Sequence, residues 1–198
     1  PRVASAAPNL RKCQSISPRA DGERHYGAAW VQKNLLRRVM EYAGLDEVQA
    51  QAMLVLQDSM NTRIDPQWRD ANFAFLRAVV VEGAEALEHH GWKWWKAQSC
   101  DWPQLRLELV DIWHFVLSHL RLQFGDRIED AALYLSRQSA SPGGPHERVE
   151  AFDGHEYHLH EMSFVDKLEL MIGLAAAGRH SVGLFASLLA DAGMGWDD

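Results

Sequence analysis

Two pairs of carboxylates, each spaced three residues apart, constrain this chain more than any other feature of its sequence. Glu82 and Glu85 form the first pair, and Glu108 and Asp111 form the second. Residues three apart share a helix face, so two such helices side by side would point four carboxylates into one space. Four carboxylates cannot all stay ionised at close range without a counter-charge. For oxygen-only ligands the usual counter-charge is a hard divalent cation, Mg²⁺, Ca²⁺ or Mn²⁺.

The apolar neighbours of these carboxylates argue against a solvated acidic surface. Three valines, residues 79–81, directly precede Glu82, so we expect this carboxylate on a partly buried helix face. A buried carboxylate without a partner is costly, which favours a metal ion or a cationic ligand beside it. Asp111 likewise interrupts an apolar helix face, which consists of Leu109, Ile112, Trp113, Val116, Leu117 and Leu120.

Helical periodicity dominates the chain, and strand signals are sparse. Gly91 is placed to end a helix, and the sequence SPGGP at 141–145 predicts a loop. The predicted fold is therefore all-α, an antiparallel helical bundle with a carboxylate-lined metal site. The expected helices are residues 29–43, 46–62, 69–90, 101–122, 161–176 and 181–192, with a weakly helical stretch at 128–138.

Length and composition indicate one domain. The chain has 198 residues, of which 47% are hydrophobic and 24% are charged, as in ordinary soluble globular proteins. Residues 1–26 show no periodicity, and we interpret them as a poorly ordered N-terminal extension, with a transit peptide as the alternative. The all-α domain is expected to occupy residues 27–198.

Charge, cysteine usage and hydropathy disfavour several functional classes. The net charge of −7 argues against a protein that coats nucleic acid. Two cysteines make no disulfide framework and fit a reducing compartment. No apolar run reaches the roughly 18 residues of a membrane span. We therefore expect a cytoplasmic protein without nucleic-acid or membrane partners, unless the N-terminal extension directs it to an organelle.

Polar residues outside the carboxylate pairs could complete a ligand site. Gln57 and Asn61 are four apart and share a helix face. They form either an ordinary polar surface or a pair of amides that hydrogen-bond a planar ligand. His114 follows Asp111 at i+3 and is either a core residue or a ligand. We expect residues 88–90, at the end of a helix, to be solvated.

The segment Trp92–Lys96, with the sequence WKWWK, lies between the carboxylate pairs. Clustered tryptophans usually belong to a core, but Lys93 and Lys96 cannot both be buried among them without cost. The alternative is an exposed wall that offers an indole for stacking and ammonium groups for phosphate oxygens.

Three kinds of function fit these residues. The first is Mg²⁺-assisted cleavage of a phosphoanhydride, with Lys93 and Lys96 on the phosphates and the amides on a base. The second is a di-iron carboxylate site, for which only Asp111 and His114 approximate the required Glu-x-x-His motif. The third is a dimerising helical module with solvated acids. The histidines at 155, 158 and 160 only weakly suggest zinc, because they lack helical spacing and cysteine partners.

Five segments of the chain carry more specific motifs: LQDSMN (56–61), IDPQWR (64–69), VEGAE (81–85), GWKWWK (91–96) and ELVDIWHF (108–115). Together they resemble the dimeric all-α dUTPases, which belong to the all-α NTP pyrophosphatase superfamily. ExxE followed by ExxD is typical of the superfamily, and LQDSMN with GWKWWK points to the dUTPase branch. The resemblance covers about residues 50 to 120 well and the C-terminal third loosely.

This resemblance implies Mg²⁺-dependent hydrolysis of dUTP to dUMP and pyrophosphate, which limits uracil in DNA. It implies that Glu82, Glu85, Glu108 and Asp111 hold a Mg²⁺ cluster, and that Glu82 also orients or deprotonates the attacking water. The implied substrate contacts are Lys93 and Lys96 with phosphates, Gln57 and Asn61 with the uracil edge, Trp94 and Phe115 with the base faces, and Asp111 or His114 with the deoxyribose 3′-hydroxyl.

The resemblance also implies a homodimer in which the partner subunit contributes to each site. Members of the family carry a further C-terminal motif, with Lys-Asn, an Arg and Gly-Tyr, that closes over the nucleotide. No match to it precedes Asp198, so we expect that the sequence stops short of this motif or departs from the pattern. The alternatives are a dCTP or broader nucleoside triphosphate pyrophosphatase and a catalytically silent, metal-binding dimeric helical protein.

Overall fold

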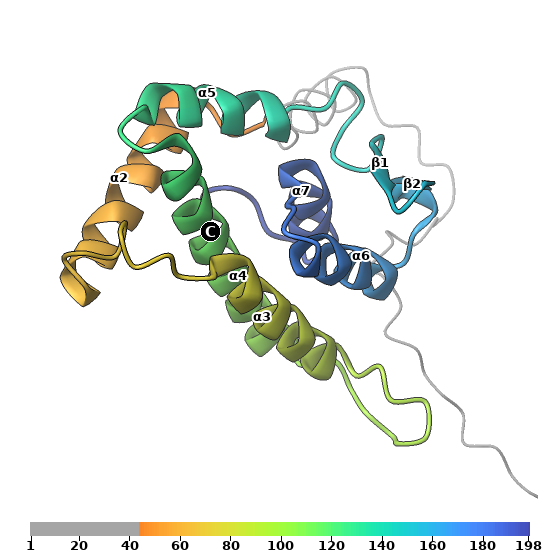
Figure 1. Ribbon diagram of the computed structural model, residues 1–198. Helices are drawn as coiled ribbons and strands as arrows, with labels where there is room; N and C mark the ends of the chain where they lie inside the picture. Colours follow the sequence, from red (N-terminus) through yellow and green to blue (C-terminus); the bar gives the residue numbers. More distant parts are fainter. Residues whose placement is uncertain (1–43) are drawn as a thin grey trace, which may run out of the picture.

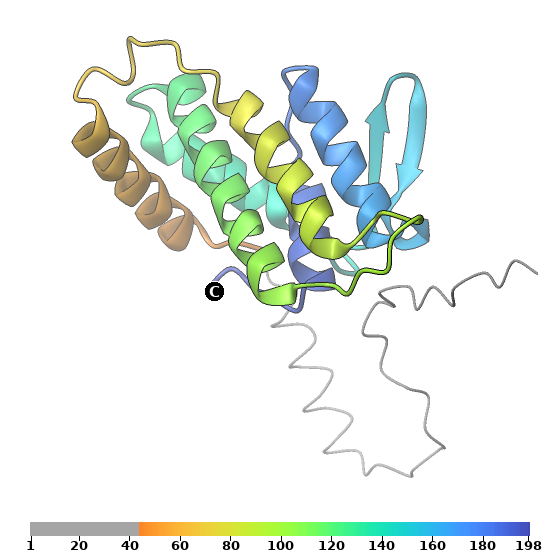
Figure 2. The ribbon, with the colours of Figure 1, turned by 90° about the horizontal axis from the view of Figure 1, so that it is seen from below.

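The computed structural model of the protein describes residues 44–198, which form a helical bundle with a small β-hairpin at one edge (Figure 1). Figure 2 shows α2, α4, α3 and α6 across the molecule in this order, with α5 and α7 behind them. The predicted all-α class is confirmed, whereas the expected helix at 29–43 and the N-terminal extension lie outside the described residues. The elements are α2 (Glu47–Ile64), α3 (Phe75–His90), α4 (Trp102–Phe124), α5 (Ile128–Ser139), β1 (Val149–Phe152), β2 (His155–His158), a 3-10 turn (Leu159–Glu161), α6 (Phe164–Ala176) and α7 (Val182–Asp191).

Local capping interactions set the ends of the helices that carry the predicted site. Asp46 begins α2, where its carboxylate accepts the backbone N–H of Gln49 at 2.8 Å. Asp101 begins α4 in the same way, with the backbone N–H of Gln104 at 3.3 Å. Each cap satisfies an N–H group that has no partner within its helix. Gly91 follows α3 with a φ of 85°, the left-handed conformation that favours glycine after a helix.

The start of α3 differs from the prediction. The helix begins at Phe75 rather than near Arg69, and residues 66–72 form turns. Trp68 is buried within this segment. The guanidinium of Arg69 lies 2.6 Å from a carboxylate oxygen of Asp58 on α2. These two side chains hold the connecting segment against the bundle, and α3 begins only after it.

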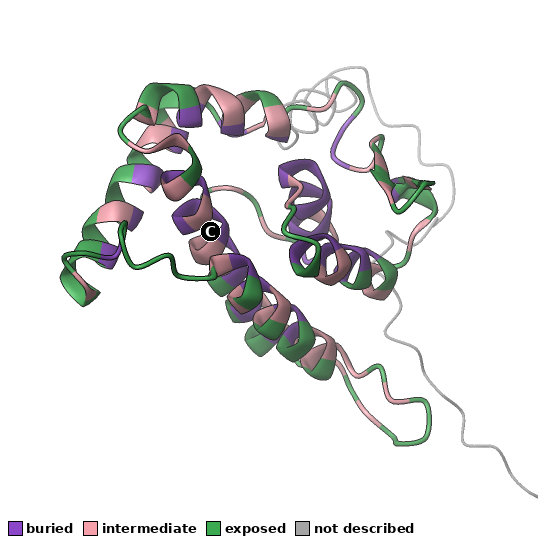
Figure 3. Cartoon of the chain, in the orientation of Figure 1, coloured by how far each residue is buried: buried purple, intermediate pink, exposed green. Residues whose placement is uncertain are grey.

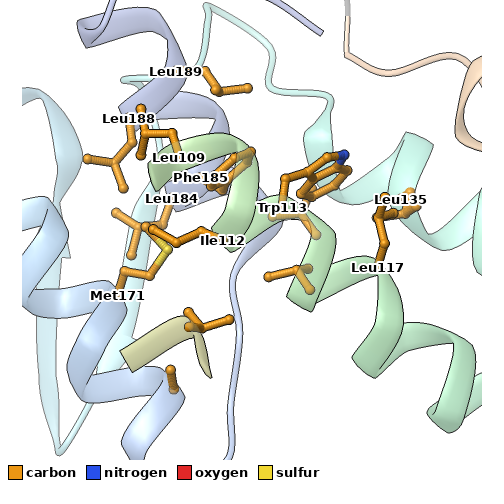
Figure 4. Packing of buried hydrophobic residues seen from close by; sticks show 14 of the residues in the cluster. Leu109, Ile112, Trp113, Leu117, Leu135, Met171, Leu184, Phe185, Leu188 and Leu189 are labelled. Atoms are coloured by element: carbon orange, nitrogen blue, oxygen red, sulfur yellow. The ribbon is translucent and has the colours of Figure 1, made fainter. Parts of the chain in front are cut away.

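The hydrophobic core surrounds the inner face of α4. Trp113 stacks on Phe185 of α7 with ring centroids 5.0 Å apart, and Figure 4 shows the leucines that pack around this pair. Figure 3 shows that α7 is buried along almost its whole length. Full burial of one large apolar side chain contributes roughly 1.5–3 kcal/mol to the stability of the fold. All the apolar residues predicted for α4 are buried, namely Leu109, Ile112, Trp113, Val116, Leu117 and Leu120.

The β-hairpin was not expected from the sequence. Its two strands pair antiparallel, with Phe152 opposite His155. Asp153 and Gly154 form the turn with φ values of 51° and 76°, and Asp-Gly is a favoured pair at such positions. The local signal was therefore present in the sequence. Within residues 44–198, the histidines of this region do not belong to a group of three side chains that could hold a metal ion.

Candidate functional site

Three of the four predicted carboxylates converge between α3 and α4. Glu82 comes from α3, and Glu108 and Asp111 come from α4. Each offers one oxygen, and these three oxygens lie within 4.8 Å of one another. We call these three residues the carboxylate trio. Asp111 is exposed despite its apolar neighbours in the sequence, and the fourth residue, Glu85, is exposed and lies outside the trio.

The negative charges around Glu82 affect the pKa of its carboxyl group. Partial burial raises the pKa of Glu82, and the charges of Glu85, Asp111 and Glu108 raise it further. Glu108 is itself only 8% exposed. Like charges held this close favour a counter-charge among them. Because all the donor atoms are carboxylate oxygens, the trio fits a hard divalent cation rather than a soft one.

Small residues on α3 allow α6 to pack closely behind the carboxylate trio. Gly83, next to Glu82, is buried, and an added Cβ there would lie 2.7 Å from Cγ1 of Ile172 on α6. Ala86, one turn later, is also fully buried. The α3 helix is thus held between α4, which shares the trio with it, and α6.

His89 reaches the carboxylate trio from the end of α3. Its Nε2 lies 3.3 Å from Oε1 of Glu108. The prediction that residues 88–90 are solvated is therefore wrong for His89. The reason is the antiparallel return of α4, which places Glu108 beside the last turn of α3. Only the packing of two helices creates this contact, so helical spacing within α3 could not indicate it.

Gln57 and Asn61 are buried and hydrogen-bonded, so the alternative of an ordinary solvated polar surface is wrong. Nε2 of Gln57 donates to Oδ1 of Asn61 at 2.9 Å. The same nitrogen and Nδ2 of Asn61 each lie 2.9 Å from Oγ of Ser118, to which they donate. Oε1 of Gln57 is 2.6 Å from Nδ1 of His114. Ser118 was not predicted, because no local pattern links it to residues on α2.

One stripe of α4 connects the amides to the carboxylates. Asp111, His114 and Ser118 follow one another at i, i+3 and i+7, so they share a helix face. They span about 10 Å along the helix axis, from the rise of 1.5 Å per residue. A ligand lying along this stripe would meet acids at one end and amides at the other.

A pair of aromatic side chains joins α4, next to His114, to the start of α3. Phe115 stacks on Phe75, with ring centroids 6.5 Å apart and planes 28° apart. Trp94, the predicted partner of Phe115, lies in the loop that follows α3. Phe75 is the first residue of α3, whose 16 residues span about 24 Å. A single chain therefore does not bring Trp94 and Phe115 into one pocket, and the contact of Trp94 with a base stays a prediction.

The tryptophan segment is exposed, so the alternative that it belongs to the core is wrong. Trp92, Trp94 and Trp95 are 44%, 73% and 58% exposed. The ammonium of Lys93 lies 2.5 Å from a carboxylate oxygen of Glu88, not at the carboxylate trio. Lys96 is exposed in the same loop. This loop projects beyond the ends of α3 and α4 (Figure 1), where no helix or strand within residues 44–198 covers the indoles.

A comparison with known protein families extends these observations. A family model described as dUTPase matches residues 49–143. This segment contains nearly all of α2, the whole of α3, α4 and α5, and every predicted site residue. These residues match the all-α dUTPase family. The resemblance inferred from the sequence is confirmed, and hydrolysis of dUTP is supported at the level of the family.

The dUTPase match ends before the hairpin, α6 and α7. No curated protein matches the chain. Part of the support for the site nevertheless comes from beyond the matched segment, because α6 packs against Gly83 beside the carboxylate trio. No helix within residues 44–198 is long and apolar enough to cross a membrane.

Proposed function

We propose that this chain is a Mg²⁺-dependent dUTP pyrophosphatase that releases dUMP and pyrophosphate and so limits uracil in DNA. One observation carries the proposal. A single stripe of α4 joins the carboxylate trio to a buried pair of amides, within the segment that matches the dUTPases. Acids suit the metal-bound triphosphate, and amides suit the polar edge of a base.

The residues present fit Mg²⁺ because the donor set consists of oxygens and carries excess negative charge. Glu82, Glu108 and Asp111 would hold the cation, and we propose Glu85 as a further ligand because its charge already acts on Glu82. When bound, the cation would neutralise the triphosphate and favour attack by water. Lys93 and Lys96 are proposed to contact phosphates. To do so, Lys93 must give up its ion pair with Glu88.

Glu82 is the proposed base. It is the one member of the trio on α3, and it faces both carboxylates of α4. It would take a proton from water as the water oxygen bonds to phosphorus. The anhydride bond between the α and β phosphates breaks in the same step, and pyrophosphate leaves with the bonding electrons.

The amide end of the stripe would hold the nucleoside. Gln57 and Asn61 are proposed to hydrogen-bond the uracil edge, with Phe115 against the face of the base. Nδ1 of His114 already bonds Gln57. Its Nε2 is therefore the atom that we propose for the deoxyribose 3′-hydroxyl, with Asp111 as the alternative.

The proposal predicts pyrophosphate release from dUTP in the presence of Mg²⁺. In parallel assays of the full chain with dUTP, dCTP and dTTP, we expect dUTP to have the highest kcat/KM. An equal or higher value for dCTP would favour the broader pyrophosphatase. Cation binding without hydrolysis of any nucleotide would favour the catalytically silent metal-binding protein.

We further propose that the chain forms a homodimer through the outer face of α2. This face presents Val48, Val55, Leu56, Met60 and Ile64, all of them exposed. Several exposed apolar side chains on one helix are typical of a protein interface. Light scattering after size exclusion should give twice the chain mass of 22.4 kDa.

Lysine substitutions provide a test of the proposed dimer surface. The double variant Leu56→Lys, Ile64→Lys should shift the protein to monomer, because two buried ammonium groups would oppose association. Val149→Lys, at an exposed valine of the hairpin, serves as the control and should leave the mass unchanged. A wild-type monomer, or a dimer that tolerates the double variant, would rule out this surface.

A further inference from the structure

Ser118 is a fully buried hydroxyl group at the centre of the amide end of the site. It donates to the backbone carbonyl of His114 at 2.8 Å. A hydroxyl has one hydrogen, so the oxygen of Ser118 can only accept from its other neighbours. Those neighbours are the amide nitrogens of Gln57 and Asn61, both at 2.9 Å.

This arrangement admits one orientation of each amide. A flipped Gln57 or Asn61 would place a carbonyl oxygen against Oγ of Ser118, which has no hydrogen to give. The flip would also leave buried amide N–H groups to find new partners, which is costly. With Nε2 of Gln57 turned towards Ser118, its Oε1 faces Nδ1 of His114 at 2.6 Å. Nδ1 must then carry the hydrogen of the neutral ring, and Nε2 of His114 becomes an acceptor.

The same network determines which hydrogen-bonding positions of the two amides remain for a ligand. Both hydrogens of Gln57 Nε2 are used, by Asn61 and by Ser118. One lone pair on Gln57 Oε1, one lone pair on Asn61 Oδ1 and one N–H on Asn61 remain for a ligand. Uracil offers a donor at N3 and an acceptor at O4, whereas cytosine offers an acceptor at N3 and a donor at N4. An amide that turns freely serves either base, but a fixed pair presents donor and acceptor in one order.

We propose that Ser118 is a specificity-determining residue that acts by holding Gln57 and Asn61 in one orientation. It is a positioning residue, since it lies beneath the amides and contacts them rather than the base. This inference rests on the proposed function for its consequence, discrimination between uracil and cytosine nucleotides. The network itself stands on the hydrogen bonds of the described residues alone.

The test is the ratio of kcat/KM for dUTP to kcat/KM for dCTP. Ser118→Ala should lower this ratio at least about tenfold, because the amides can then turn to suit either base. Ser118→Thr keeps the hydroxyl and should keep the ratio close to the wild-type value. Ser187→Ala is the matched control: Ser187 is an equally buried serine, on α7, and its hydroxyl contacts His146. An unchanged ratio in Ser118→Ala would overturn the proposal.

Nitrogen-15 NMR of the histidine rings provides a readout that does not depend on turnover. In the full-length wild-type chain, His114, assigned by the loss of its signals in His114→Gln, should show the neutral tautomer with hydrogen on Nδ1. Ser118→Ala should show a mixture of the two tautomers. A wild-type ring with hydrogen only on Nε2 would overturn the inference. If the wild type hydrolyses neither nucleotide, the proposed function fails, and the tautomer still decides whether Ser118 orders the amides.

Discussion

Glu82→Gln is expected to lower the turnover of dUTP about 10²-fold or more, on the scale of losing a general base. The substitution keeps the size of the side chain but removes its ability to take a proton from water. It also removes one of the negative charges of the carboxylate trio. Steady-state pyrophosphate release at saturating Mg²⁺ measures the loss.

A second carboxylate provides the control for Glu82. Glu169 is an exposed glutamate on α6, and Glu169→Gln makes the same chemical change on a helix surface away from the trio. It should retain wild-type turnover. Near-normal turnover of Glu82→Gln would assign the proton transfer to another group, whereas an equal loss in both variants would point to a general effect of net charge.

Removal of divalent cations is expected to abolish turnover and to lower the thermal stability of the protein. Mg²⁺ that binds only the folded state stabilises it by about 2.7 kcal/mol at a concentration 100 times Kd. For a chain of this length, that corresponds to a rise of roughly 5–10 °C in Tm. Differential scanning calorimetry with Mg²⁺ and with chelator measures the shift without any substrate.

The change in thermal stability caused by Asp111→Asn, measured without and with Mg²⁺, distinguishes a cation site from an ordinary acidic surface. Without cations this variant should be more stable than the wild type, because one of the mutually repelling charges around Glu82 is gone. With Mg²⁺ it should gain less stability than the wild type. Glu169→Gln should change neither the stability without cations nor the gain in stability with Mg²⁺. A wild-type Tm that is independent of Mg²⁺ would contradict a cation site at the trio.

Helix ends were largely predictable from the sequence, because the interactions that form them span three or four residues. Asp46 and Asp101 each bond a backbone N–H three positions later, and Gly91 follows the helix that it ends. The start of α3 was not predictable in this way. It depends on Trp68 and on the ion pair of Arg69, which connect residues on different elements.

The carboxylate pairs show how much of a site residue spacing alone can predict. Three residues turn a helix by about 300°, so members of an i,i+3 pair are offset by about 60° around the axis. On α4 both Glu108 and Asp111 lie in the trio, whereas on α3 only Glu82 does. Which member of a pair lies at the contact between two helices depends on how those helices rotate against each other.

The sequence by itself determined the helical class, most helix ends and the acidic faces, because each depends on residues within a few positions of one another. The tertiary structure alone decided that the tryptophan segment is exposed, that His89 meets Glu108 and that Glu85 stays outside the trio. It also placed Ser118 beneath the amides, although Gln57 and Asn61 lie 61 and 57 residues away from it in the chain. Contacts over such separations depend on the packing of whole helices.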